Sequence, residues 1–238
     1  MKRQIFNKYD KSKIATLPRA VFEGRIVVLL SPYETKKAVD FLLSQTILGV
    51  DTETRPSFKR GVNHKVSLLQ VACHNICFLF RLNHTGITPD IIRLLEDTSV
   101  PKIGLSWHDD LNMLHKLADF KAGNFIDLQK CVGEIGIEDL SLQKIYANIF
   151  GGKISKGQQL TNWESDVLNE KQKLYAATDA WVCIEIMKEL QRVEPKSEKL
   201  SIISVMPTMQ APATEHHPKH HRRHRNKRRV HHSEPQKQ

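Results

Sequence analysis

Four short apolar runs in the first 82 residues limit the fold more than any other feature of the sequence. They span residues 26–30, 47–53, 66–73 and 76–82. Each is rich in Val, Ile, Leu or Phe and has the length of a typical strand. Only two residues, at 74–75, separate the last two runs, so these runs are expected to pair as an antiparallel hairpin. The chain is therefore expected to build a sheet early.

Helix-like patterns alternate with these runs and then dominate. The predicted elements are helices over residues 34–44 and 89–96 and a short buried strand over 102–105. A further helix begins near Asp109 or Asp110, and from there the chain is predicted to be mostly helical to Val193, apart from a loop at 151–157. Strands first and helices after them indicate an α/β fold with a mixed parallel and antiparallel central sheet, flanked by helices.

The positive charge is concentrated at the C-terminal end. The 238 residues carry a formal net charge of +10, and +7 of it belongs to residues 195–238. After Met206 this segment has almost no aliphatic residues, which are needed to offset the entropy of folding. We therefore expect an N-terminal extension at 1–21, one folded domain at 22–194 and a disordered basic tail, rich in His and Arg, at 195–238.

The composition argues against several protein classes. No apolar run approaches the roughly 18 residues that cross a bilayer, and charged residues stand where a signal peptide would be apolar: Lys8, Asp10, Lys11 and Lys13. The four cysteines form no C-x-x-C pair, which argues against a disulfide framework or a cysteine-rich zinc site. We expect a cytoplasmic protein without membrane association, and no protein partner is evident from the sequence.

Two carboxylates follow the second apolar run. Asp51 and Glu53 stand two residues apart at its end, and residues two apart in a strand project from the same face. Like charges this close raise each other's proton affinity unless a cation lies between them. If the strand has already ended here, both side chains face water instead, and this fragment by itself supports either reading.

A single acidic residue interrupts an apolar helix near the end of the predicted domain. Asp179 is the only formal charge within residues 174–184, and such a charge is costly unless it is paired or binds a metal. Tyr175 lies one turn earlier, on the same helix face. The alternative is an amphipathic helix with Asp179 at its solvated edge.

A third acidic site lies between the other two. Residues 103–114 are typical of a buried strand, a loop and the start of a helix, with Asp109 and Asp110 near that start. An aspartate at a helix start is usually a cap. Its position between the other two sites nevertheless brings the number of candidate metal ligands to four.

Taken in order, these motifs resemble the 3′-5′ exonuclease superfamily named for its acidic residues Asp-Glu-Asp-Asp. The matching segments are Val50-Asp51-Thr52-Glu53 with the strand at 65–70 after it, the stretch from Gly104 to Leu114, and Tyr175-Ala176-Ala177-Thr178-Asp179. The resemblance covers residues 22–193 and is to the tyrosine subclass, which includes ribonuclease D and the Werner-type exonuclease domain. Leu174 occupies the position of the histidine that defines the other subclass.

The resemblance implies a ribonuclease H-like fold and a metal-dependent reaction. In that reaction, phosphodiester bonds at the 3′ end of nucleic acid are hydrolysed and nucleoside 5′-monophosphates are released. For the second motif we choose Asp110 over Asp109, because the family usually has Leu four residues after the catalytic Asp, and Leu114 fits. Asp109 is then a capping or supporting group.

The resemblance also implies two Mg²⁺ or Mn²⁺ ions, held by Asp51, Glu53, Asp110 and Asp179. Asp51 would bridge the ions, Asp110 would act through water, and Tyr175 would orient the attacking water. Two ions roughly 4 Å apart can generate a hydroxide, neutralise the phosphoryl oxygens and stabilise the departing alkoxide. Oxygen ligands without a His or Cys cage favour Mg²⁺ or Mn²⁺ over zinc.

A basic stretch follows the first motif and contains Arg55, Lys59, Arg60 and Lys65, with Phe58 among them. These residues are candidates for nucleic-acid binding, in which the cations guide a phosphate backbone and Phe58 stacks on a base. An ordinary solvated loop is the alternative.

Aromatic residues near the motifs allow structural and functional readings. Trp163 is expected to pack in the core rather than to act as a wedge on the substrate side. Trp107 and His108 directly precede the second motif, where they are candidates to line the cleft, and His108 is expected to be a hydrogen-bonded loop residue rather than a ligand.

The basic tail is expected to attract nucleic acid without sequence preference, while transition-metal binding by its histidines is an alternative. The leading interpretation is an exonuclease acting on single-stranded or frayed 3′ ends, with RNA versus DNA left open. A catalytically inactive nucleic-acid-binding protein acting through the tail is the main alternative, and an endonuclease or transposase on the same fold is a third. The intact acidic set favours the enzyme.

Overall fold

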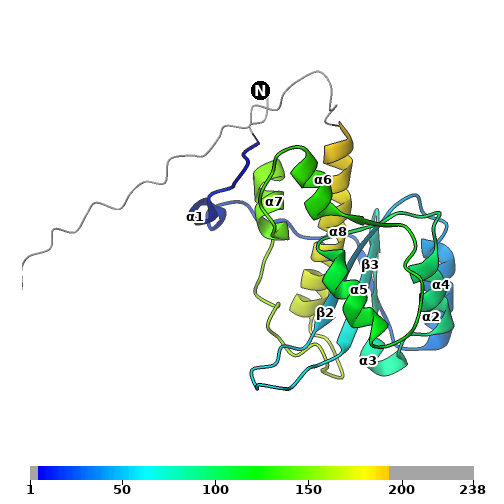
Figure 1. The fold of residues 1–238 in the computed structure, drawn as a ribbon. Coiled ribbons are helices and arrows are strands. Elements are labelled where there is room, and N and C mark those ends of the chain that lie inside the picture. The colour runs from blue at the N-terminus through cyan, green and yellow to red at the C-terminus, as the bar shows by residue number, and fades with distance from the viewer. Residues whose placement is uncertain (1–4, 193–238) are drawn as a thin grey trace, which may run out of the picture. The chain divides into compact units, whose positions relative to one another are not determined.

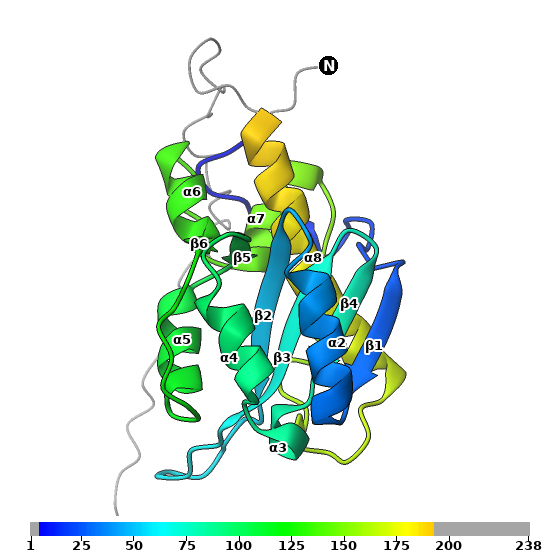
Figure 2. The ribbon, with the colours of Figure 1, turned by 90° about the vertical axis from the view of Figure 1, so that its right-hand side faces the viewer.

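A six-stranded sheet lies at the centre of the molecule, with helices on both faces (Figure 1 and Figure 2). The computed structural model describes residues 5–192, so the expected tail at 195–238 lies outside the described residues. The strands are β1 (Arg25–Leu29), β2 (Leu48–Thr54), β3 (Val66–Cys73), β4 (Ile76–Phe80), β5 (Lys102–Gly104) and β6 (Phe125–Asp127). The helices are α1 (Lys11–Ile14), α2 (Pro32–Leu42), α3 (Leu82–Thr85), α4 (Pro89–Glu96), α5 (Trp107–His115), α6 (Leu128–Glu134), α7 (Leu142–Phe150) and α8 (Glu170–Arg192).

The strand order in the sheet is β1-β4-β3-β2-β5-β6. Strand β3 is antiparallel to both of its neighbours, β2 and β4, and all other neighbouring pairs are parallel. The predicted mixed sheet and the hairpin at residues 74–75 are therefore confirmed. The three-residue strand β6 was not predicted. The expected loop at residues 151–157 is confirmed, but residues 158–169 form turns and bends rather than the mostly helical chain that was expected.

The two faces of the sheet belong to different cores, as strand alternation requires. Leu69 and Val71 of β3 face the core that contains the buried residues of α2 and α4. Leu68 and Ala72 of the same strand face the other way, towards the small buried residues of α8. Figure 2 shows α2 and α4 on one side of the sheet and α8 on the other.

Helix α8 begins at a reciprocal pair of capping hydrogen bonds. The backbone N–H of Gln172 donates to Oδ1 of Asn169 at 3.0 Å, and the N–H of Asn169 donates to Oε1 of Gln172 at 3.1 Å. This arrangement satisfies two backbone donors at the helix start. It fixes where α8 begins and therefore where Tyr175 and Asp179 lie along it.

The described part of the N-terminal extension packs against the domain. Ile5 is buried in the same core cluster as residues of α7, and the amide of Asn148 in α7 bonds to both backbone groups of Phe6. Further along, Arg19 forms a parallel bridge with Lys153. Between residues 5 and 192 no helix is both long and apolar enough to cross a membrane.

Candidate active site

Strand β2 and helix α8 approach each other closely at Gly49. A Cβ atom built on Gly49 would lie 2.0 Å from the carbonyl oxygen of Ala180, so a glycine is needed for this approach. Asp51 lies two residues after Gly49 on the same strand face, and Asp179 directly precedes Ala180 on the helix. The backbone contact therefore brings two acidic residues together that are 128 positions apart in the sequence.

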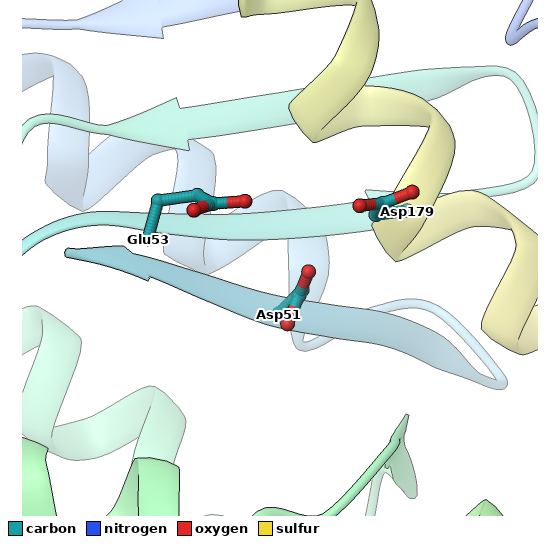
Figure 3. A group of neighbouring side chains, drawn as sticks. All are labelled: Asp51, Glu53 and Asp179. Atoms are coloured by element: carbon teal, nitrogen blue, oxygen red, sulfur yellow. The ribbon is translucent and has the colours of Figure 1, made fainter. Parts of the chain in front are cut away.

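Three carboxylates meet between β2 and α8. Asp51, Glu53 and Asp179 each offer an oxygen atom that lies within 4.8 Å of the other two, and Figure 3 shows the three side chains facing a common space. Val50, the residue before Asp51, packs into the opposite core. Glu53 is 8% and Asp179 is 7% exposed, so neither side chain lies at a solvated edge, and the readings that placed them there are wrong.

Burial and mutual repulsion raise the proton affinity of this cluster. Burial first, and then the charges of Asp179 and Asp110, place the pKa of Asp51 well above its ordinary value. Burial and the charge of Asp51 do the same to the pKa of Glu53. Burial raises the pKa of Asp179 to about 7, although a hydrogen bond from Tyr175 opposes the shift. Without a cation, Asp179 is thus partly protonated near neutral pH.

Tyr175 lies one turn before Asp179 and donates its hydroxyl hydrogen to the Asp179 carboxylate. The side chain is buried, and its ring centroid is 6.0 Å from that of the fully buried Trp163. Burial and the neighbouring acidic charges raise the pKa of Tyr175 above its ordinary value. The phenol is therefore suited to donate a hydrogen bond rather than to act as a base. The burial of Trp163 confirms its expected packing role.

The two adjacent aspartates of the second motif differ in placement. Asp110 accepts a hydrogen bond from the hydroxyl of Thr52, which stands between the two acidic residues of β2. Burial raises the pKa of Asp110 to about 6. Asp109 is exposed. Asp110 does not belong to the group of three whose oxygens lie within 4.8 Å of one another. It stands beside that group, close enough for its charge to raise the pKa of Asp51.

Asp127 orients the loop that leads into α5, and sequence reasoning missed it. Its two carboxylate oxygens accept the backbone N–H groups of Ser106 at 3.0 Å and Trp107 at 3.2 Å. Oδ1 also accepts the N–H of Gln129, which caps α6. Ser106 has a φ of 61°, a left-handed conformation that this anchoring supports. The signal in the sequence is an aspartate before a helix, but β6 is too short to be recognised from pattern alone.

A cleft of about 260 Å³ opens onto the carboxylates. Besides the three acidic residues and Tyr175, it is lined by Thr52, Leu105, Ser141, Leu142, Gln143, Ile154, Ser155, Lys156, Gln159 and Cys183. The positive charge of Lys156 partly opposes the rise that burial causes in the pKa of Asp179. Sequence reasoning treated its segment only as a loop. The sequence feature that could have pointed to this residue is the Lys156-Gly157 pair, which precedes the third motif.

The proposed nucleic-acid-binding residues lie in the loop that connects β2 and β3, residues 55–65. Phe58 is 84% exposed, and both Arg60 and Lys65 are exposed. Arg55 and Lys59 line a groove of about 500 Å³ together with Met113 of α5 and Lys116, which follows that helix. The groove begins at Thr54, the residue after Glu53, so a basic surface adjoins the acidic cluster.

Trp107 does not line the cleft. It is 4% exposed and packs edge-on against Phe125, with ring centroids 4.7 Å apart. A Cβ on Gly104 would lie 2.6 Å from the Trp107 ring, so the indole fills space that the glycine leaves. The reading that placed Trp107 in the cleft is therefore wrong. His108 is exposed, and its Nε2 lies 3.1 Å from the amide nitrogen of Asn112.

The oxygen donors fit a divalent metal. Three carboxylates that repel one another in a buried site are stabilised by a bound cation, and hard oxygen ligands suit Mg²⁺ or Mn²⁺. The described residues place no histidine in this group. The cluster is therefore able to bind metal.

The family model for a 3′-5′ exonuclease matches residues 27–193. Among curated proteins, the bifunctional 3′-5′ exonuclease/ATP-dependent helicase WRN of Mus musculus is 30% identical over 150 residues, covering 60% of this chain and 11% of that protein. Exonuclease 3′-5′ domain-containing protein 2 of Drosophila melanogaster is 33% identical over 141 residues, covering 57% of this chain and 24% of that protein. The chain thus matches a quarter or less of these two relatives' length.

Solved structures show the same fold. The EXO domain of Aedes aegypti Nibbler superimposes with a TM-score of 0.65 at 19% identity, covering 71% of this chain and 88% of that one. Escherichia coli RNase D gives a TM-score of 0.61 at 18% identity, covering 71% of this chain and 46% of that one. The ribonuclease H-like fold and the exonuclease resemblance are therefore confirmed. From the match over residues 27–193, the chain belongs to the 3′-5′ exonuclease family.

Proposed function

We propose that the protein hydrolyses phosphodiester bonds at the 3′ end of nucleic acid and releases nucleoside 5′-monophosphates, using two Mg²⁺ or Mn²⁺ ions. The observation that carries the proposal is the meeting of three carboxylates from β2 and α8 within 4.8 Å, next to a hydrogen-bonded tyrosine. A protein that only binds nucleic acid gains nothing from buried negative charge that faces a polyanion.

Asp51, Glu53, Asp110 and Asp179 would hold the two ions, and Asp51 would serve both. When bound, the ions supply a nucleophilic hydroxide and neutralise charge on the phosphoryl group. Asp110 lies beside Thr52 and outside the group of three. This placement supports the proposal that Asp110 holds the second ion from a greater distance.

Tyr175 orients the attacking water rather than taking its proton, because its raised pKa keeps the phenol protonated. Its presence one turn before Asp179 supports assignment to the tyrosine subclass. Lys156, at the edge of the cleft, offers a positive charge to the terminal nucleotide.

The substrate is a single-stranded or frayed 3′ end, and Phe58, Arg60 and Lys65 bind the strand upstream of it. RNA is supported by one structural neighbour, Trypanosoma brucei RNase D, which was solved with RNA and superimposes with a TM-score of 0.63 at 20% identity, covering 74% of this chain and 65% of that one. DNA is the alternative substrate, because DNA polymerase I of Aquifex aeolicus is 25% identical over 156 residues, covering 66% of this chain and 25% of that protein. A cytoplasmic location and the basic tail as a nucleic-acid-binding segment complete the proposal.

The proposal is tested with RNA and DNA strands labelled at the 5′ end, in Mg²⁺ or Mn²⁺. The wild type should shorten the strands from the 3′ end and release nucleoside 5′-monophosphates, and EDTA should stop the reaction. Asp51→Asn and Asp179→Asn should remain folded and lose at least about a thousandfold in rate, since each removes a metal ligand. Digestion by these variants at the wild-type rate would show that the site is wrongly assigned.

A further inference from the structure

The basic loop between β2 and β3 is held at both of its ends by one carboxylate from a distant part of the chain. Glu164 Oε2 accepts a hydrogen bond from Nη1 of Arg55 at 3.1 Å, and Oε1 lies 2.8 Å from Nδ1 of His64. Because a carboxylate only accepts, the His64 ring carries its proton on Nδ1. Arg55 begins the loop and His64 is its penultimate residue, so Glu164 ties the two ends together.

Glu164 is itself fixed from several sides. Its N–H donates to Oδ1 of Asn162 at 3.0 Å, and its carbonyl oxygen accepts a hydrogen bond from Asn83 at 3.4 Å. The preceding residue, Trp163, is fully buried. The guanidinium of Arg81, 1% exposed, donates to the carbonyl oxygens of the two residues after Glu164. The carboxylate is therefore presented from a rigid backbone.

The loop itself has little that holds it apart from this anchor. A turn at Lys59 to Val62, with Gly61 at a φ of 81°, and local bonds to the Ser57 hydroxyl are its internal hydrogen bonds among the described residues. Phe58 at its tip is 84% exposed. Partial burial raises the pKa of Glu164, but its bonds to Arg55 and His64 outweigh this, so the net pKa lies below its ordinary value.

We propose that Glu164 is a positioning residue that holds the loop at residues 55–65 as one wall of the nucleic-acid groove beside the active site. This inference rests on the proposed function, because the loop is useful in this position only if a strand runs past it. The groove begins at Thr54 and lies between the loop and α5, with Lys59 on one side and Lys116 on the other.

Removing the Glu164 carboxylate has two opposing effects on the binding of a nucleic-acid strand. Their relative sizes decide whether binding becomes weaker or tighter. The loss of one negative charge favours a polyanion, but an exposed charge pair changes binding by about fivefold at most. Fixing the backbone of a single residue costs about fivefold or more in binding, and a released loop has several residues to fix. We therefore expect weaker, not tighter, binding of the strand.

The test compares Glu164→Gln with Asp166→Asn, which removes the same charge two residues away from an exposed side chain. With a twelve-nucleotide single strand, Glu164→Gln should raise KM about tenfold and leave kcat within about twofold. With the p-nitrophenyl ester of a nucleoside 5′-monophosphate, which is too short to reach the loop, its KM should equal that of the wild type. Asp166→Asn should behave as the wild type, or bind slightly more tightly, on both substrates.

Limited trypsin digestion measures the loop without any catalysis. Cleavage after Lys59 or Arg60 should accelerate about tenfold in Glu164→Gln and stay unchanged in Asp166→Asn, because cleavage follows the population of open loop. In the Arg55→Gln/His64→Gln background, Glu164→Gln should add nothing. Equal cleavage and equal KM for the two single variants would overturn the inference. A wild type that cleaves neither substrate would refute the proposed function, while the digestion result would still judge the anchor.

Discussion

The acidic cluster and the basic loop lie side by side along β2, and they are built in opposite ways. The cluster gathers three acidic groups, two of them buried, at a place set by backbone packing between Gly49 and Ala180. The loop carries exposed cations, and Arg55 and His64 near its two ends both contact the carboxylate of Glu164. A bound cation would relieve the repulsion among the carboxylates of the cluster. In the loop, Arg55 and His64 already have a partner without a ligand.

This contrast assigns the two regions to different kinetic parameters. Groups that act only on the reacting phosphate lower kcat when they are removed, whereas groups that hold the strand equally before and during reaction raise KM. Substitutions in the cluster should therefore reduce kcat, and substitutions in the loop should raise KM.

The largest difference is expected between the two aspartates of the second motif. Asp110→Asn should lower kcat by about 10²- to 10³-fold, because it removes a group that supports charge neutralisation in the transition state. Asp109→Asn should stay within about twofold of the wild type, because its side chain is exposed. Steady-state rates on a single strand in Mg²⁺ measure both. If Asp109→Asn is the slower variant, the placement of Asp110 beside Thr52 has been misinterpreted.

The packing that creates the cluster is tested by Gly49→Ala. The new methyl group would meet a backbone oxygen that cannot rotate away, so the variant should lose about 3 kcal/mol in the free energy of unfolding. Its kcat should fall at least about tenfold as the carboxylates separate.

Gly133→Ala in α6 is the matched control for that variant. Nothing lies within 4 Å of a Cβ at this position, so the substitution should be neutral or stabilising by about 0.5 kcal/mol. Urea unfolding gives both free energies. Equal stability of the two variants would show that β2 and α8 can separate without cost.

The burial of the Asp179 carboxylate predicts a stability effect of opposite sign. The folded-state pKa of Asp179 is raised to about 7, so the folded protein binds more protons than the unfolded chain. Its contribution to stability is present below the ordinary pKa of the carboxyl and is lost as pH rises through about 7. In metal-free buffer at pH 8, Asp179→Asn should therefore be more stable than the wild type by about 2 kcal/mol.

That advantage should shrink towards pH 4, where the wild-type carboxyl is protonated, and it should reverse when Mn²⁺ is added, because only the wild type gains from binding the ion. Thermal unfolding at pH 8, at pH 4 and at pH 8 with Mn²⁺ measures this difference in stability between the variant and the wild type. A variant that is less stable than the wild type in metal-free buffer at pH 8 would contradict the idea that the buried Asp179 charge destabilises the metal-free fold.

The smallest effects are expected in the groove. Lys59→Ala and Lys116→Ala should each raise KM about threefold and reduce the slope of log KM against log salt by about 0.7, the change for one phosphate contact on a single strand. Lys37→Ala on α2, where the lysine stacks on Tyr33, should change neither. A lower kcat with unchanged KM in the groove variants would break the division between the two regions.

The acidic site was largely predictable from the sequence. The spacing of Asp51 and Glu53 fixes their common face by strand alternation, and a lone charge at Asp179 in an apolar helix indicates a special environment. Local sequence periodicity is sufficient to predict both features. The mixed sheet followed from the length and order of the apolar runs.

Other features depend on contacts that no local pattern contains. The approach of Gly49 to Ala180 follows from the packing of two elements, and the pairing of Glu164 with Arg55 joins residues 109 positions apart. Strand β6 is too short to show periodicity, so the sequence did not reveal that Asp127, at its end, anchors the loop before α5. Trp107 was misplaced because its burial depends on the space above Gly104.

The central claim is that Asp51, Glu53 and Asp179 hold a divalent cation. Crystals soaked in Mn²⁺, with diffraction recorded at the manganese absorption edge, test it most directly. The account predicts an anomalous peak between the three carboxylates in the wild type, with distances of about 2.0 to 2.3 Å to their oxygens, and no such peak in Asp51→Asn crystals. An empty cluster in the wild type, with manganese bound elsewhere or not at all, would contradict the claim.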